Sequence, residues 1–159
     1  MGDLTNLGKK AEKKVKEWLD RPQQGCYFLR LPDQLSGFSG SANTCDFIMY
    51  RTPKFYLIES KATLNDNFPY TMITDYQYTH MLEAAQVAGV TSYIIVLFAS
   101  YQRAFLLDIK DIAEEKEAGR KSLNITKVDK WKIPYIEVKT LKSRKELLDY
   151  DPSQIEALF

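Results

Sequence analysis

Asp46 and the triplet Glu59-Ser60-Lys61 are the residues of this chain whose types and spacing could support catalysis. The two acids are 13 positions apart, and Glu59 and Lys61 are separated by a single residue. Side chains at positions i and i+2 of a strand point to the same face, so Glu59 and Lys61 would project together. If Asp46 lies on the neighbouring strand of a hairpin, two carboxylates and one ammonium group meet at one place.

This combination of groups suits a divalent cation and a phosphate. Carboxylate oxygens are preferred ligands of Mg²⁺, for which Mn²⁺ can substitute, and the main-chain carbonyl of Ser60 could be a further ligand. A metal held there would polarise a phosphodiester and lower the pKa of a bound water, while Lys61 would orient that water or stabilise charge on the phosphoryl oxygens. The alternative is a structural salt bridge between Lys61 and an acid at the strand end. The bare spacing favours that alternative, and the order of the surrounding elements favours the metal site.

The elements that must position these residues can be read from apolar periodicity and turn residues. Helical spacing covers residues 4–19, before Arg21-Pro22, and residues 74–88, where Thr74 or Asp75 is the expected N-cap and Gly89 the stop. The remaining predicted elements are strands at 26–31, 45–50, 55–61, 91–98 and 103–107, a turn at 51–54, loops at 32–44 and 65–70, and a helix at 108–118. No pattern is assigned beyond residue 120. We therefore predict a single domain over residues 1–159, of the α/β (α+β) class, with a mixed central β-sheet flanked by helices.

Composition excludes several classes of protein. Hydrophobic residues make up 45% of the 159 residues and charged residues 27%, which is typical of a chain that folds around its own core. The chain shows no secretory signal pattern and no apolar run of about 18 residues, so we expect a cytoplasmic protein without membrane spans. Cys26 and Cys45 are expected to be reduced core residues. His80, the single histidine, excludes a His-cluster zinc site and is expected to pack or hydrogen-bond on its helix.

Basic residues are unevenly distributed, although the net charge is only +1. Two segments hold most of the clustered positive charge: Lys9, Lys10, Lys13, Lys14 and Lys16 in the first, and Arg120, Lys121, Lys127, Lys130, Lys132, Lys139, Lys142, Arg144 and Lys145 in the second. Clusters of this kind can form a phosphate-binding face on a nearly neutral protein. We predict that Lys9, Lys10, Lys13, Arg120 and Lys121 contact DNA. The alternative for each is an ordinary solvated lysine or, for Arg120 and Lys121, a group that complements a helix C-terminus.

Together the motifs resemble a known family. The matching stretches, in order along residues 6–125, are Asn6-x-Gly8-x-x-x-Glu12, Cys45-Asp46-Phe47, Ile58-Glu59-Ser60-Lys61-Ala62-Thr63, Phe68-Pro69-Tyr70, Gln77-x-x-His80-Met81 and Gly119-Arg120-Lys121-Ser122. A helix, three strands, a helix and a strand, with the acids and the lysine on strands two and three, resemble the PD-(D/E)xK nuclease superfamily. More narrowly, the chain resembles the RecU-type Holliday junction resolvases of Gram-positive bacteria and their phages.

The resemblance implies a restriction-endonuclease-like core and assigns roles to individual residues. Asp46 and Glu59 match the main metal ligands, and Glu12 matches an acidic residue that the first helix contributes to the same site. Lys61 matches the catalytic lysine, and Gln77 a glutamine on the following helix. Without the resemblance, Glu12 would be read as an i,i+4 partner of Lys16. Members of the family are homodimers that bind four-way junctions, insert a projecting stalk and make paired nicks.

Three departures from the family pattern are visible. Leu7 stands where the family often has Arg, and residues after about 130 match poorly. The segment between Cys26 and Cys45 is shorter than a full stalk region. Residues 35–42, within the loop 32–44, would therefore be a reduced stalk or a mobile loop. The prediction is a Mg²⁺-dependent endonuclease that acts as a dimer on branched DNA and leaves 5′-phosphate ends. The alternatives are a nuclease of the same superfamily without junction preference, and an inactive DNA-binding protein of the same fold.

Overall fold

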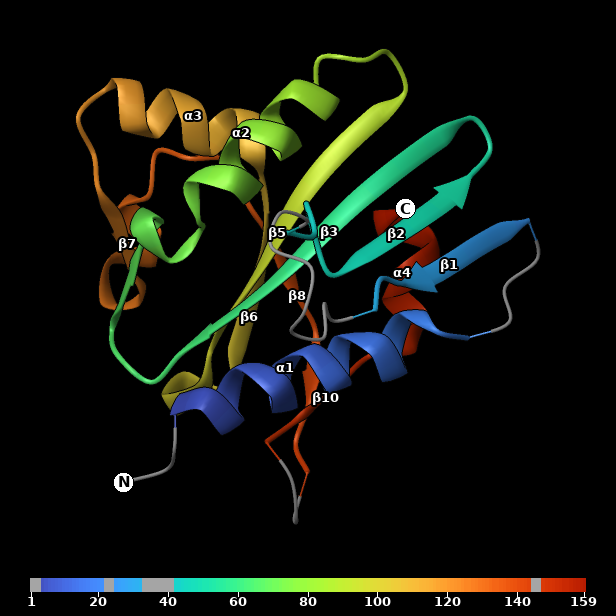
Figure 1. Cartoon of the computed structure of the whole chain (residues 1–159). Helices are drawn as coiled ribbons and strands as arrows, with labels where there is room; N and C mark the ends of the chain where they lie inside the picture. Colours follow the sequence, from blue (N-terminus) through green and yellow to red (C-terminus); the bar gives the residue numbers. More distant parts are fainter. Residues whose placement is uncertain (1–3, 22–24, 33–41, 144–146) are drawn as a thin grey trace.

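A six-stranded mixed sheet forms the centre of the computed structural model, which describes residues 4–21, 25–32, 42–143 and 147–159 (Figure 1). The sheet has the strand order β1-β2-β3-β5-β6-β8, and its members are β1 (Cys26–Arg30), β2 (Phe47–Arg51), β3 (Lys54–Thr63), β5 (Val90–Phe98), β6 (Arg103–Asp108) and β8 (Ile136–Val138). The β3–β5 pair is parallel and all other neighbours in this sheet are antiparallel. The predicted class, a mixed central sheet flanked by helices, is confirmed.

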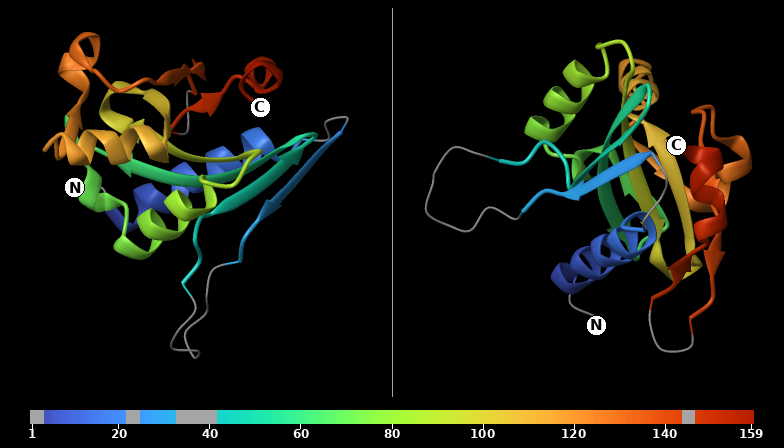
Figure 2. Two further views of the ribbon diagram at one scale, coloured as in Figure 1. Left: turned by 90° about the horizontal axis from the view of Figure 1, so that it is seen from above. Right: turned by 90° about the vertical axis from the view of Figure 1, so that its right-hand side faces the viewer.

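Helices cover both faces of the sheet, as the views in Figures 1 and 2 show together. On one face lie α1 (Leu4–Leu19) and the C-terminal α4 (Ile155–Leu158), packed through Trp18, Tyr150 and Ile155. On the other face lie α2 (Asp75–Ala84) and α3 (Ile109–Glu117). The parallel β3–β5 connection runs through α2, as parallel pairing requires a crossover. The main elements predicted for a restriction-endonuclease-like core, from the first helix to the strand after the second, are found in the predicted order, with one short strand and a 3-10 turn added before α2.

Short elements complete the chain. They are β4 (Asn67–Pro69), β7 (Ser122–Asn124), β9 (Thr140–Leu141), β10 (Asp149–Tyr150) and the 3-10 helices η1 (Tyr70–Met72), η2 (Ala99–Tyr101), η3 (Ile125–Lys130) and η4 (Pro152–Gln154). β4 pairs with β7, and β9 with β10. In the parts of the chain that are described, no helix is long and apolar enough to cross a membrane.

Several boundaries differ from the sequence prediction. The predicted loop at 65–70 contains β4, because its backbone finds a partner strand at residues 122–124. The predicted helix 74–88 ends at Ala84, and tight turns lead to Gly89, whose φ of +84° suits glycine. The strand predicted from residue 45 begins at Phe47, so Asp46 lies just before β2.

The prediction that both cysteines are core residues is correct for one of them. Cys45 is buried, whereas Cys26 on β1 is partly exposed, and both thiols are free. The predicted reduced stalk lies almost wholly outside the described residues, as do Arg144 and Lys145 of the basic cluster.

The register of β2 along β3 places the acids. β2 pairs with β3 from Lys54 as far as Ile58, whereas β5 accompanies β3 as far as Thr63. The stretch of β3 that carries Glu59 and Lys61 therefore continues beyond the start of β2. Asp46, the residue immediately before β2, is left beside it.

Candidate active site

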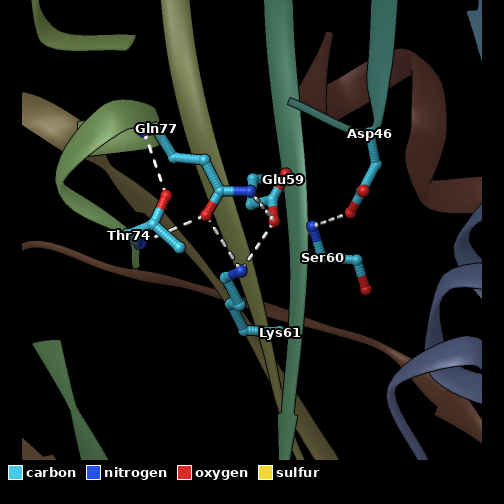
Figure 3. Close-up of polar contacts among 6 residues, drawn as sticks. All are labelled: Asp46, Glu59, Ser60, Lys61, Thr74 and Gln77. Atoms are coloured by element: carbon cyan, nitrogen blue, oxygen red, sulfur yellow. Dashed lines mark hydrogen bonds and ion pairs between the residues drawn. The ribbon is translucent and has the colours of Figure 1, made fainter. Parts of the chain in front are cut away.

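Asp46 lies at the edge of β3, held by main-chain and side-chain hydrogen bonds. Its carbonyl accepts a 2.8 Å hydrogen bond from the Leu31 N–H, which ties it to the end of β1. Its carboxylate oxygen Oδ2 accepts from the Ser60 N–H at 2.8 Å (Figure 3). Asp46 therefore satisfies an edge amide of β3 at the point where β2 no longer follows that strand.

Glu59 is almost fully buried, with 2% of its surface exposed. Its Oε1 atom accepts hydrogen bonds from Lys61 Nζ and Gln77 Nε2, both at 2.7 Å. Its Oε2 atom is buried and has no hydrogen-bond partner among the residues that the structure describes. Because an unpaired buried carboxylate oxygen is costly, this atom is a candidate ligand for a cation.

Gln77 connects the site to the first turn of α2. Its Oε1 atom accepts from Lys61 Nζ at 3.1 Å and from the Thr74 N–H at 3.2 Å, while the Thr74 hydroxyl accepts from the Gln77 N–H. This reciprocal pair is a capping box, which starts the helix and fixes the orientation of the Gln77 amide. The helix itself is held on β5, because Ser92 Oγ donates to the Met81 carbonyl at 2.8 Å. Figure 3 shows Lys61, Glu59 and Gln77 converging on the side of β3 that faces α2.

Burial dominates the electrostatics of the two acids. It raises the pKa of Asp46 to about 7, with a further increase from the charge of Glu59, while the Ser60 hydrogen bond opposes the increase. Burial likewise raises the pKa of Glu59, although Lys61 and the Gln77 hydrogen bond lower it in part. Two neighbouring carboxylates that resist ionisation would both be stabilised as anions by a divalent cation.

Glu12 stands near the pair but is already engaged. Arg30 Nε donates to Glu12 Oε1 at 2.7 Å. Glu12 therefore pairs with a residue of β1, and not with Lys16, which was the partner expected if Glu12 were an ordinary helix-surface residue. The charge of Glu12 nevertheless raises the pKa of both Asp46 and Glu59, so Glu12 lies close enough to act on the pair. Within the described ranges, no group of three or more acidic, histidine or cysteine side chains is close enough to hold a metal ion.

The donor set that fits a metal is therefore two carboxylates and a main-chain carbonyl. The N–H and C=O groups of one strand residue point to the same side, so the Ser60 carbonyl shares the β3 edge at which its N–H meets Asp46. Mg²⁺ is commonly held by one or two carboxylates and keeps several waters, so this set is sufficient. The unpaired Glu59 Oε2 atom is the observation that supports the fit.

The predicted DNA-contacting residues fall into two separate places. Lys9, Lys10 and Lys13 are exposed on α1, on one face of the sheet, and Lys13 lies 3.7 Å from Glu17. Arg120 and Lys121 follow α3 on the opposite face.

Two residues at the site were missed by the sequence prediction as site residues. Thr74 was expected only as a helix cap. The Thr74-x-x-Gln77 spacing is the sequence signature of a capping box, and it could have shown that the Gln77 side chain binds the main chain of Thr74. Arg30 gave no signal, since its pairing with Glu12 joins a strand to a helix that is distant in sequence.

Comparison with known proteins assigns the chain to a family. No curated protein matches the sequence. Among solved structures, the chain is similar to that of Hjc, a Holliday junction resolvase from the archaeal hyperthermophile Archaeoglobus fulgidus, with 14% sequence identity, a TM-score of 0.46, and coverage of 65% of this chain and 78% of that one. That likeness is distant and assigns nothing by itself. The family model of Recombination protein U (RecU) matches residues 34–150, which is most of the chain and includes Asp46, Glu59, Lys61 and Gln77. The chain belongs to the Recombination protein U family.

Proposed function

We propose that the protein is a Mg²⁺-dependent endodeoxyribonuclease that resolves Holliday junctions, or other branched DNA, by paired nicks. The observation that carries the proposal is the buried Glu59 carboxylate, with one oxygen held by Lys61 and Gln77 and the other without a partner in the described structure. Membership of a recombination family makes branched DNA the substrate to test first.

In the proposed site, Asp46, Glu59 and the Ser60 carbonyl hold the metal, and Mn²⁺ would substitute for Mg²⁺. When bound, Mg²⁺ would supply Lewis-acid polarisation of the scissile phosphate and of a nearby water. Glu12 would act through charge, since its carboxylate is already paired with Arg30.

The chain's own groups would supply positioning and charge. The Lys61 ammonium, 2.7 Å from Glu59 and 3.1 Å from Gln77 Oε1, is held where it can stabilise charge that builds on the phosphoryl oxygens. Gln77 binds the acid and the ammonium with one amide, so their separation is fixed before substrate arrives. Attack by water and departure of the 3′ oxygen would leave 5′-phosphate ends.

Paired nicks need two sites, so we propose that the working form is a homodimer on the junction. Two symmetry-related copies of the site would cut opposing strands. Sedimentation with and without a synthetic junction measures this directly.

Cleavage of a labelled four-way junction and of a linear duplex, each with Mg²⁺ and with EDTA, tests the proposal. Asp46→Asn and Glu59→Gln are expected to abolish cleavage and to retain most of the DNA affinity, since they remove charge and keep shape. Glu137→Gln is the matched control, because Glu137 pairs with Arg103 at the far side of the sheet.

Each outcome separates the alternatives. Symmetric junction nicks that require Mg²⁺ support resolution, and equal cutting of duplex indicates a nuclease without junction preference. Binding without cutting indicates an inactive DNA-binding protein. Full activity in either acid variant would remove the proposed metal site.

A further inference from the structure

A basic pocket lies beside the C-terminal end of α3, outside the Asp46–Glu59 site. It encloses about 200 Å³ and is lined by Tyr70, Thr71, Lys116, Gly119, Arg120 and Lys121. Three of these six residues are cationic and none is acidic.

The end of α3 builds this pocket. The helix closes with a Schellman motif, in which the Gly119 N–H bonds to the Lys116 carbonyl at 3.0 Å and the Arg120 N–H to the Glu115 carbonyl at 2.9 Å. Gly119 has φ of +80°, a conformation that glycine adopts without strain. The motif also turns the chain so that Arg120 and Lys121 follow directly at the pocket.

Arg120 is held in place rather than free to bind a ligand. Its Nε and Nη2 atoms donate to the two oxygens of Glu115, both at 2.6 Å, and Glu115 is only 5% exposed. This pair neutralises the charge of Glu115. Lys116 and Lys121 then supply the uncompensated charge of the lining, which amounts to two positive charges.

The two lysines are placed differently. The Lys116 ammonium lies 3.6 Å from the centroid of the Tyr78 ring, so a cation–π contact with α2 positions it. Lys121 is exposed, and its main-chain carbonyl accepts from the Tyr70 N–H at 2.9 Å, which anchors β7 to η1. Thr71 adds an exposed hydroxyl. The lining therefore includes two lysines and a threonine, whose flexible ammonium groups and hydroxyl can donate to the oxygens of a phosphate bound there.

The pocket is close to the candidate active site along the chain. Thr71 precedes Thr74 by three residues, and Gln77 follows one helical turn later. Three extended residues span at most about 11 Å and one helical turn about 5 Å, so the Cα atoms of Thr71 and Gln77 lie within about 16 Å. Phosphates of one DNA strand recur every ~3.4 Å along the duplex axis, so both sites can be reached by one strand within a few nucleotides.

We infer that this pocket binds a backbone phosphate of the DNA substrate, a few nucleotides from the scissile one, through Lys116, Lys121 and Thr71, with Arg120 held by Glu115 as part of its wall. The inference rests on the proposed function for the identity of the ligand. It differs from the sequence prediction by including Lys116 and by giving Arg120 a supporting role.

The test is DNA binding in EDTA, where cleavage does not interfere. Fluorescence anisotropy with a labelled four-way junction, at several NaCl concentrations, compares Lys116→Gln/Lys121→Gln with Lys54→Gln/Lys110→Gln. The control pair removes the same charge, at the β2–β3 turn and at the start of α3, outside the pocket lining. All four lysines are exposed, so the folds should survive, and circular dichroism checks this.

The pocket pair is expected to weaken binding on the order of tenfold and to reduce the slope of log K against log [salt] by about 1, the loss of one phosphate contact. The control pair should change affinity less than about twofold. Equal effects of the two pairs would overturn the inference, since the loss would then reflect net charge alone.

A second arm distinguishes DNA from free phosphate as the source of the anion. Inorganic phosphate, added at constant ionic strength, should compete with the junction for the wild type and less for the pocket variant. A pocket that binds inorganic phosphate while the variant keeps full DNA affinity would also overturn the inference. Wild-type protein that binds no DNA at any salt concentration would refute the proposed function itself, which separates the two failures.

Discussion

Replacing Gln77 with Glu removes one hydrogen bond of the proposed site and places a second carboxylate beside Glu59. The Gln77 amide oxygen accepts from Lys61 and from the Thr74 N–H, and a glutamate oxygen can accept from both. Glutamate also serves as well as glutamine at this position of a capping box, so the start of α2 is retained. What disappears is the donor, Nε2–H, which lies 2.7 Å from Glu59 Oε1.

The size of the effect follows from the burial of Glu59. A hydrogen bond to a charged group contributes about 1.5–3 kcal/mol, and Glu59 is 2% exposed, so solvent replaces little of it. Each 1.36 kcal/mol is a factor of ten in rate, so single-turnover cleavage at neutral pH should fall about ten- to a hundredfold.

The pH dependence should change in a defined direction. The Gln77 hydrogen bond lowers the pKa of Glu59, and a carboxylate in its place would raise that pKa further. A larger fraction of Glu59 is then protonated at neutral pH and cannot bind the metal. The rising limb of the pH–rate profile should therefore move to higher pH, with part of the activity recovered there.

Single-turnover rates of junction cleavage between pH 6 and pH 9 measure both effects. Gln77→Ala is the companion variant, since it loses the donor and the cap together and should also lower the thermal midpoint. Thr74→Ser, which keeps the capping hydroxyl, should behave as wild type. A Gln77→Glu protein with the wild-type rate and an unshifted profile would refute the role given to this amide.

Three further predictions concern stability. Burial raises the pKa of Asp46 to about 7, so the folded state holds this proton more tightly than the unfolded state, and stability falls as pH rises from about 4 to 7. Asp46→Asn should remove this penalty, on the order of a few kcal/mol, so the metal-free variant should be more stable than wild type at pH 8. In thermal denaturation scans the difference should vanish near pH 4. Mg²⁺ should raise the thermal midpoint of the wild type, measured by calorimetry, and Glu59→Gln should lose most of that increase; an equal shift in both would place the ion elsewhere. Gly119→Ala should destabilise the protein by about 1 kcal/mol, because the φ of Gly119 is +80°. Gly8→Ala should stabilise it by up to about 1 kcal/mol, because Gly8 lies inside α1 and nothing is within 4 Å of the new Cβ. Thermal midpoints that shift in the same direction for both variants would contradict this backbone argument.

Local patterns in the sequence predicted the parts of the fold that depend on short-range periodicity. The period-2 rule placed Glu59 and Lys61 on one face, and their side chains lie 2.7 Å apart. The apolar stripe of α1 and the glycine at the end of α3 also match the structure. Each of these features is encoded within a few neighbouring residues.

Features that depend on distant partners were not predictable from local pattern. β4 and β7 have three residues each and exist as strands because they pair across more than 50 positions of sequence. The C-terminal segment has little periodicity of its own, yet Trp18 Nε1 donates to the Asp151 carbonyl and Tyr150 packs against the same ring. The salt bridge between Glu12 and Arg30 joins elements that a linear reading keeps apart. In each case tertiary packing selects the conformation.

The position of Asp46 explains why the site lies where it does. β3 continues to Thr63 beside β5, while its pairing with β2 ends at Ile58, so main-chain groups on one edge of β3 lose their sheet partners there. Asp46 satisfies the Ser60 N–H at that edge, and the Ser60 carbonyl points to the same edge. A longer β2 would cover this edge with ordinary sheet hydrogen bonds and leave no place for a cation. The end of β2–β3 pairing therefore has two consequences. It leaves the Ser60 N–H without a sheet partner, which Asp46 supplies, and it exposes the edge of β3 on which the proposed chemistry depends.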